Sequence, residues 1–159
     1  LQTPDGGCES DKTSASVASL DVRTTARSLQ QASRAPEYVQ CLDLSSTGAF
    51  VCKNMFCENV GQSCVCRLSL WISQMSPRLT ALTTLSLANN GLEQVPESVG
   101  ELNNIKWLDL SHNDIRELPA SMTRLQRLEK LDIRGNLRLR DSTITGLKTH
   151  FPGINVISS

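Results

Sequence analysis

The sequence predicts an α/β solenoid in which six to seven short parallel strands line the concave face and short helices or 3₁₀ turns line the convex face. The first observation behind this prediction is a pattern of aliphatic residues and one Asn that occurs three times, at intervals of 23 residues. The second is an aliphatic residue followed by Pro at the same point of two copies, Val95-Pro96 and Leu118-Pro119. The third is a composition with 39% hydrophobic but only 4% aromatic residues, which suits a core of Leu, Val and Ile.

Each copy of the pattern predicts one strand and the turn that follows it. The two aliphatic residues in the middle of a copy alternate with other residues, so they form a short strand with one buried face. The Asn can hydrogen-bond the backbone of adjacent turns where the chain leaves the strand. Because no single copy can bury its aliphatic face, the copies must stack. The three copies are Leu82, Leu85, Leu87, Asn90 and Leu92; Ile105, Leu108, Leu110, Asn113 and Ile115; and Leu128, Leu131, Ile133 and Asn136.

The stretch between one Pro and the next copy predicts the convex side. Val99, Leu102 and Ile105 follow Pro96 at a spacing of three, which favours one or two turns of helix or 3₁₀.

The spacing L-x-x-L-x-L-x-x-N-x-L resembles that of the leucine-rich repeat family, and its 23-residue period lies inside the range of that family. The Pro-containing form of the repeat is similar to that of Ras-suppressor and plant Ras-group-related leucine-rich repeat proteins. This resemblance implies a short leucine-rich repeat solenoid that acts by binding other proteins and has no catalytic activity.

The rest of the chain is divided by stepping along the repeat period. The steps predict strands near residues 42, 64, 85, 108, 131 and 154, with a possible seventh near 20. Residues 17–36 have two interpretations, an N-terminal capping helix or a degenerate first repeat. The resulting divisions are a polar tail at 1–16, the cap or first repeat at 17–36, and the solenoid at 37–159, with regular repeats at 82–136, irregular Cys-containing repeats before them and a degenerate last repeat after them.

The six cysteines all precede the regular repeats. The last four are spaced C-x4-C-x6-C-x-C and are Cys52, Cys57, Cys64 and Cys66. Three states remain open for them: reduced and mostly buried, joined in one or two disulfides, or bound to a metal such as zinc. The metal is disfavoured because zinc sites usually carry paired C-x2-4-C ligands. We therefore expect no metal or cofactor, and we expect Cys64 and Cys66 to be buried in strand positions.

Catalytic chemistry finds little support in the sequence. Only two His are present, His112 and His150, and no Ser or Cys nucleophile has a base at the spacing of a known motif. The formal net charge is zero, so nothing indicates a nucleic-acid partner. No stretch approaches the ~20 apolar residues of a membrane-spanning helix. We therefore predict a protein that is not an enzyme.

Two surfaces are candidates for binding a protein partner. The first is the concave strand face, where outward positions carry Trp107, Asp109, Lys130, Asp132 and Arg134. Trp107 is its expected anchor, since exposed Trp often dominates binding; the alternative is that it only covers neighbouring strands. The second is the C-terminal end of the solenoid, which carries Phe151, Ile154, Val156 and Ile157. An open end of this kind invites another chain, unless residues 141–150 fold back and cover it.

The predicted function is a scaffold or interaction module. The chain starts with Leu1 rather than Met, which favours a fragment or a processed precursor and an accessory subunit of a larger, organellar assembly. The alternative is a secreted leucine-rich repeat recognition protein with a disulfide-stabilised N-terminal region. The partner and the compartment stay open at this point.

Overall fold

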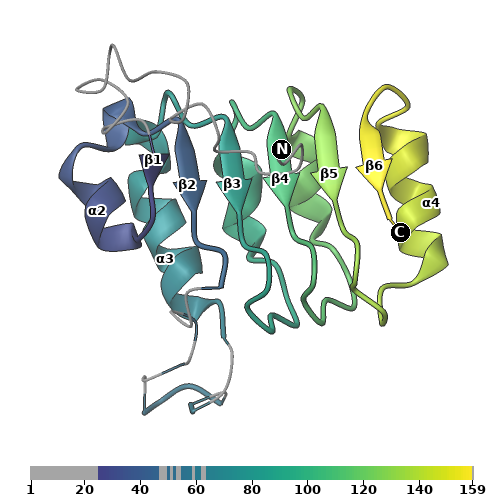
Figure 1. Ribbon diagram of the computed structural model, residues 1–159, viewed down its shortest axis with the longest axis horizontal. Helices are drawn as coiled ribbons and strands as arrows, with labels where there is room; N and C mark the ends of the chain where they lie inside the picture. Colours follow the sequence, from purple (N-terminus) through teal and green to yellow (C-terminus); the bar gives the residue numbers. More distant parts are fainter. Residues whose placement is uncertain are drawn as a thin grey trace.

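The computed structural model describes residues 25–46, 50, 52, 55–58, 60–61 and 64–158. Its centre is one open sheet of six parallel strands that follow each other in chain order, as Figure 1 shows. The strands are β1 (Thr25–Ala26), β2 (Cys41–Asp43), β3 (Thr84–Ser86), β4 (Trp107–Asp109), β5 (Lys130–Asp132) and β6 (Asn155–Ile157). The predicted α/β solenoid is therefore confirmed.

The helices connect one strand to the next. They lie behind the sheet and at its two ends (Figure 1), which leaves one face of the strands without a helix. The α-helices are α2 (Leu29–Arg34), α3 (Cys66–Met75) and α4 (Asp141–His150), and the 3₁₀ helices are η3 (Pro36–Tyr38), η4 (Ser76–Arg78), η5 (Glu97–Glu101) and η6 (Ala120–Arg124).

The register of the sheet explains the first aliphatic residue of each strand. The central residues of neighbouring strands are in register, and they form one row across the sheet that consists of Leu42, Leu85, Leu108, Leu131 and Val156. The four leucines are at most 1% exposed, so this row is the centre of the core. Each leucine is covered by the repeats on both sides, which is why the repeats are stable only when stacked.

The second aliphatic residue extends the sheet ladder past the strands. Leu87 donates its N–H to the carbonyl of Asp109, and Leu110 donates its N–H to the carbonyl of Asp132, both at 2.8 Å. Leu87 and Leu110 are fully buried. The backbone bond and the aliphatic side chain thus hold adjacent turns together at the same point.

The Asn of each copy satisfies backbone groups at the turn. The amide nitrogen of Asn113 donates to the carbonyls of Leu87 (2.9 Å) and Leu110 (3.0 Å). Its amide oxygen accepts from the N–H groups of Asn90 (2.9 Å) and Leu92 (3.1 Å). A buried backbone group without a partner would be costly, so this one side chain ties two turns together.

The convex wall depends on close contact between the 3₁₀ helices. Pro96 and Pro119 come directly before η5 and η6, where their fixed φ suits the start of a helix. A Cβ placed on Gly100 of η5 would lie 2.5 Å from the carbonyl oxygen of Ser121 in η6. Glycine is therefore required at position 100 by the close approach of the next repeat.

The strand expected near residue 64 is absent, and this prediction was wrong. Cys64 comes before α3 and is half-buried, while Cys66 is exposed as the first residue of α3. Strand β2 pairs directly with β3, with Cys41 in register with Thr84. The reason is that the chain enters helix α3 at Cys66, and this helix lies on the convex side behind the sheet.

Helix α3 takes its place in the wall through two buried residues, Leu68 and Ile72, which lie four positions apart on one face of the helix. Trp71 and Met75 of the same helix are partly buried and also pack against the core. The indole nitrogen of Trp71 donates to the hydroxyl of Ser33 at 2.8 Å, which links α3 to α2. Trp71 thus lies on the convex side.

The N-terminal part of the described chain contains both a strand and a helix. Strand β1 pairs with β2, and α2 follows two residues later with Ser28 as its cap, since the Ser28 hydroxyl accepts from the N–H of Gln31 at 3.0 Å. The tail at 1–16 and the possible strand near 20 lie outside the described residues, so the division at 17–36 stays a prediction. Over the described ranges, none of the helices has the length and apolar character needed to cross a bilayer.

Candidate protein-binding surface

The strand register places the sequence-predicted residues in two rows on the side of the sheet opposite the leucine core. The first row runs along the start of the strands and contains Cys41, Thr84, Trp107, Lys130 and Asn155. The second runs along their ends and contains Asp43, Ser86, Asp109, Asp132 and Ile157. Of the five predicted concave residues, two therefore lie on β4 and two on the neighbouring β5, and Arg134 lies two residues after β5.

Trp107 and Lys130 form the most distinctive contact of the first row. They are direct neighbours on β4 and β5, and the Lys130 Nζ lies 4.1 Å from the centroid of the Trp107 ring. A cation over an indole ring is attracted by about 0.5–1 kcal/mol at a surface site, so the two side chains fix each other's position. Both residues are half-buried. The Trp107 indole N–H is itself buried, and it has no acceptor among the residues that the structure describes.

The second row is held by carboxylates at the strand ends. Three Asp residues each accept a hydrogen bond from the backbone N–H two residues later, in the pattern of an Asx turn. The pairs are Asp43 and Ser45 at 3.1 Å, Asp109 and Ser111 at 3.0 Å, and Asp132 and Arg134 at 3.1 Å. This bonding gives Asp109 and Asp132 a structural role that the sequence analysis missed, and their contact with a partner stays a prediction.

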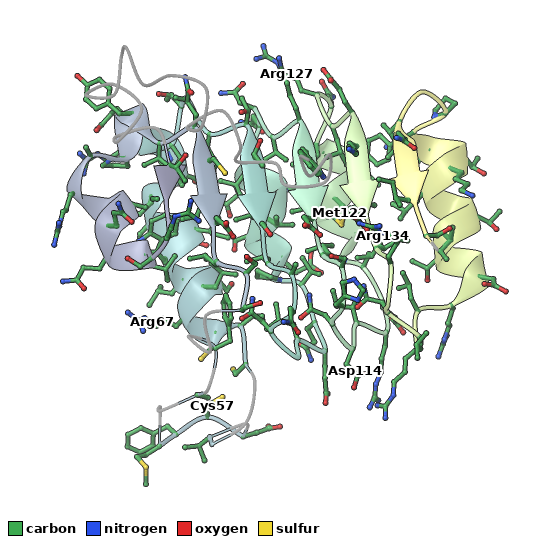
Figure 2. All side chains as sticks on the ribbon, viewed as in Figure 1. Cys57, Arg67, Asp114, Met122, Arg127 and Arg134 are labelled. Carbon is green, nitrogen blue, oxygen red and sulfur yellow. The ribbon has the colours of Figure 1, made fainter. Side chains whose placement is uncertain are left out.

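Burial affects the two carboxylates of the second row on β4 and β5, Asp109 and Asp132. Burial raises the pKa of Asp109 above its usual value, although the two hydrogen bonds from Ser111 act in the opposite direction and the neighbouring Asp132 adds to the increase. Asp132 is fully buried and forms an ion pair with Arg134, with 2.7 Å between Oδ2 and Nη2. Arg134, which is labelled in Figure 2, keeps about a third of its side chain exposed.

The C-terminal end of the solenoid adjoins these rows through β6. Residues 141–150 form α4, which lies beside β6 at the end of the sheet (Figure 1), with Leu147 buried. Phe151, Ile154 and Val156 pack against the core but are only half-buried, and Ile157 is half-buried as well. The end therefore keeps partly exposed apolar side chains, and its contact with another chain stays a prediction.

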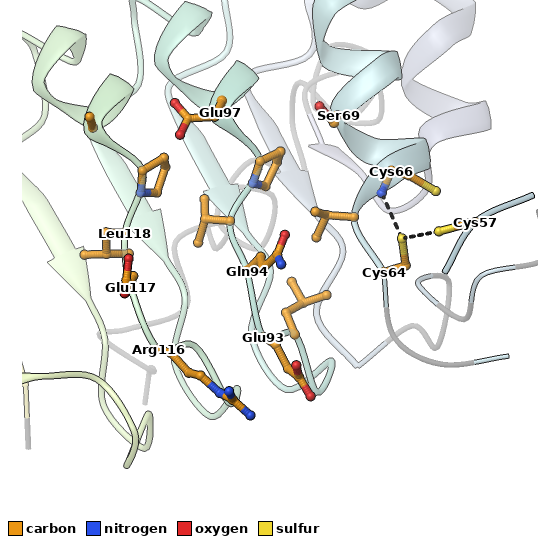
Figure 3. Close-up of a pocket in the computed structure, with 16 residues that line it drawn as sticks. Cys57, Cys64, Cys66, Ser69, Glu93, Gln94, Glu97, Arg116, Glu117 and Leu118 are labelled. Carbon is orange, nitrogen blue, oxygen red and sulfur yellow. Dashed lines mark hydrogen bonds between the residues drawn. The ribbon is translucent and has the colours of Figure 1, made fainter. Parts of the chain in front are cut away.

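A second feature lies where α3 begins. Cys52, Cys57, Cys64 and Cys66 are thiols whose sulfur atoms all lie within 4.8 Å of one another. Figure 3 shows Cys57, Cys64 and Cys66 at one end of an open groove of about 940 Å³. The Pro-containing turns of two repeats form the rest of the groove, with Glu93, Gln94, Glu97, Arg116 and Glu117 among its lining residues. Cys64 and Cys66 were expected in strand positions, and the groove was not predicted from the sequence.

Neighbouring thiols shift the pKa values of Cys64 and Cys66. Burial opposes ionisation of Cys64, but hydrogen bonds from the backbone N–H and the thiol of Cys66, and from Cys57 and Cys52, outweigh it and hold the pKa of Cys64 below its usual value. The hydrogen bond to Cys64, burial and the bond to Cys52 raise the pKa of Cys66 to about 12. Of these two thiols, Cys64 is therefore the one that ionises more readily.

Comparison with known proteins agrees with the repeat geometry. Residues 80–137 match the family model described as leucine rich repeat. No curated protein matches the chain. A solved leucine-rich repeat protein of Leptospira interrogans is 20% identical in sequence and superposes with a TM-score of 0.57, over 83% of this chain.

This chain spans only 28% of the length of the Leptospira protein, so the likeness concerns the fold. Stacked repeats of this kind create extended concave surfaces for binding, which supports a role as a protein–protein interaction module. The pattern of the three copies and the family match agree that residues 80–137 form leucine-rich repeats, and the six parallel strands in register show that the chain has a repeat-solenoid fold.

Proposed function

We propose that the protein is a non-catalytic interaction module that binds a protein partner on the concave strand face, with Trp107 at the centre of the contact. The observation that carries this proposal is the Trp107–Lys130 pair at 4.1 Å, together with the indole N–H that lacks an acceptor among the described residues. A buried donor without an acceptor costs about 1–3 kcal/mol, and a carbonyl or carboxylate of a partner would recover that energy.

The surroundings of Trp107 suit an interface. A side chain that is already fixed by its neighbour loses little conformational freedom on binding, and Trp is among the residues that most often dominate binding energy. Lys130 beside it favours a partner segment with acidic side chains. Ile157 of β6 is half-buried, continues the second row and would extend the contact to the C-terminal end.

The experiment compares the two tryptophans of the chain. The partner is identified by chemical cross-linking and native purification, and its Kd is then measured for the wild type, Trp107→Ala and Trp71→Ala. We expect Trp107→Ala to weaken binding about 10-fold to 100-fold, as removal of a central aromatic contact does. Trp71→Ala is the matched control, since Trp71 lies on the convex side, and it should leave the Kd within about 2-fold.

Thermal unfolding of the same variants separates binding from structure. Trp107→Ala should change the melting temperature little while it weakens binding. If Trp107→Ala lowers the melting temperature but leaves the Kd unchanged, Trp107 only covers its neighbouring strands and the proposal is wrong.

Two more specific roles are compatible with this function. An accessory subunit of a larger, organellar assembly would use the concave face and the β6 end together. A secreted recognition protein is the second candidate, and the disulfide bond of Cys41 favours it, since disulfides persist in oxidising compartments. Localisation of the tagged protein in cells distinguishes the two settings.

A further inference from the structure

We propose that Cys52, Cys57, Cys64 and Cys66 bind one zinc ion as a tetrahedral tetrathiolate, which anchors the segment between β2 and α3 to the solenoid. This site is separate from the concave face and does not depend on the function proposed for it.

The distances between the sulfur atoms are the first argument. Zinc bound to four thiolates has Zn–S bonds of about 2.3 Å, so a tetrahedral site places its sulfur atoms about 3.8 Å apart. The sulfurs of Cys52 and Cys66 are 3.8 Å apart, and those of Cys57 and Cys64 are 3.6 Å apart. No pair of the four is separated by more than 4.8 Å, so a shift of about 1 Å would complete the tetrahedron.

The local backbone brings these four residues together. The N–H of Cys64 donates to the carbonyl of Phe50 at 2.8 Å, and the N–H of Gly61 donates to the carbonyl of Cys52 at 2.7 Å. Gly61 has a φ of +83°, a value that favours glycine, and it turns the chain between these two contacts. The loop that carries Cys57 is therefore folded back against the start of α3.

The environment suits thiolate ligands. The backbone N–H of Cys66 points to the Cys64 sulfur at 3.4 Å, and such donors stabilise a negatively charged sulfur. Cys66 is the first residue of the ten-residue helix α3, whose N-terminus also favours negative charge. On binding, the four thiols release four protons to solvent, and the four thiolates share one Zn²⁺.

The segment between β2 and α3 needs such an anchor. Phe50 at the start of this segment is buried in the core, but Met55 is 80% exposed and Phe56 is 99% exposed, so the part of the loop next to Cys57 buries little apolar surface. Figure 2 shows Cys57 in the loop, which extends away from the sheet below α3. A segment with little apolar burial cannot offset its loss of conformational entropy without a cross-link or a metal.

Two disulfides are the alternative cross-link. Cys41 of the same chain is disulfide-bonded, whereas these four sulfurs converge on one point as thiols. A disulfide joins only two sulfurs, whereas four thiolates around a single centre are the ligand set that zinc prefers.

The test begins with the metal content of the full chain, purified natively without reductant or chelator. We expect about one zinc per chain by elemental mass spectrometry. Replacement of zinc by Co²⁺ should give the visible bands and the thiolate charge-transfer absorption of a tetrahedral site. After denaturation with a chelator, the four cysteines should react as thiols.

Variants connect the metal to these residues. Cys57→Ser and Cys66→Ser each remove one ligand, and we expect the zinc affinity to fall by more than about 100-fold. Glu58→Gln, an exposed change in the same loop, is the matched control and should keep the full zinc content. Far-ultraviolet circular dichroism of each variant reports whether the solenoid stays folded, so that loss of metal is separated from loss of fold.

Each other outcome overturns the proposal. Two disulfides among the four cysteines by peptide mass spectrometry, with no zinc, would assign the cross-link to disulfides. Iron in place of zinc would overturn the assignment of the metal. Thiols that bind neither zinc nor Co²⁺, or full zinc content in folded Cys66→Ser, would show that the sulfur cluster is not a metal site.

Discussion

Substitution of Asn113 by Ala tests the repeat architecture most sharply. Four hydrogen bonds of 2.9–3.1 Å depend on this one buried side chain, two to carbonyls and two from N–H groups. Each intramolecular hydrogen bond contributes about 1 kcal/mol, so their loss should cost about 4 kcal/mol. That is a large share of the ~5–15 kcal/mol by which a domain of this size is stable.

Urea denaturation followed by circular dichroism measures this loss. With a denaturant slope of about 2 kcal/mol/M, the midpoint of Asn113→Ala should fall by about 2 M. Asn103→Ala is the matched control, because Asn103 is exposed and should change the free energy of unfolding by less than about 0.5 kcal/mol. If the two variants unfold at the same urea concentration, the Asn side chains do not hold the turns together and the reasoning is refuted.

Two further predictions concern close packing and charge. Gly100→Ala should destabilise the protein by about 1–3 kcal/mol because a Cβ would lie 2.5 Å from the Ser121 oxygen. Gly146→Ala in α4 meets no atom within 4 Å and should be neutral or stabilising by up to about 1 kcal/mol, so equal melting temperatures would contradict the packing argument. Burial raises the folded-state pKa of Asp109, so stability from protonation is present at low pH and is lost as the pH rises through that pKa. Asp109→Asn should therefore stabilise the protein at neutral pH but not below about pH 4, and urea midpoints at both pH values check this.

The sequence predicts the regular repeats well because their determinants are local. Leu85, Leu108 and Leu131 each carry the same pattern of neighbours 23 residues apart, and all three lie at the centre of the core. Alternation of side chains along a strand then fixes which residues face outward, so the position of Trp107 beside Lys130 also follows from the period.

Counting along the chain by one repeat length gives a wrong strand position where the repeat period is interrupted. A step of one repeat back from Leu85 leads to Cys64, but the chain there has left the sheet, and α3 begins at Cys66. The sequence signal for a helix in this part was the spacing of Leu68 and Ile72, which are four residues apart and so share one helix face. Both residues are buried in the structure. Nothing in the spacing of the cysteines shows that their sulfurs meet, because the meeting depends on how the loop returns to α3.

The structural role of the carboxylates was also missed, although the sequence contained a signal. Asp109 and Asp132 are 23 residues apart, and each bonds the N–H of the second residue after it. Recurrence of a polar residue at a repeat period indicates a turn contact as readily as a binding surface. Trp107 has no equivalent in the neighbouring repeats, where Thr84 and Lys130 stand in register with it, and this is why it remains the stronger candidate for binding.

Fluorescence of Trp107 tests the central claim, that a partner binds the concave face, most directly. In a Trp71→Phe background Trp107 is the sole tryptophan, and its accessibility to acrylamide is measured in the isolated protein and in the partner complex. We expect its emission to shift and its quenching to fall when the partner binds. Unchanged emission and quenching under conditions where calorimetry shows the complex to be formed would contradict the account.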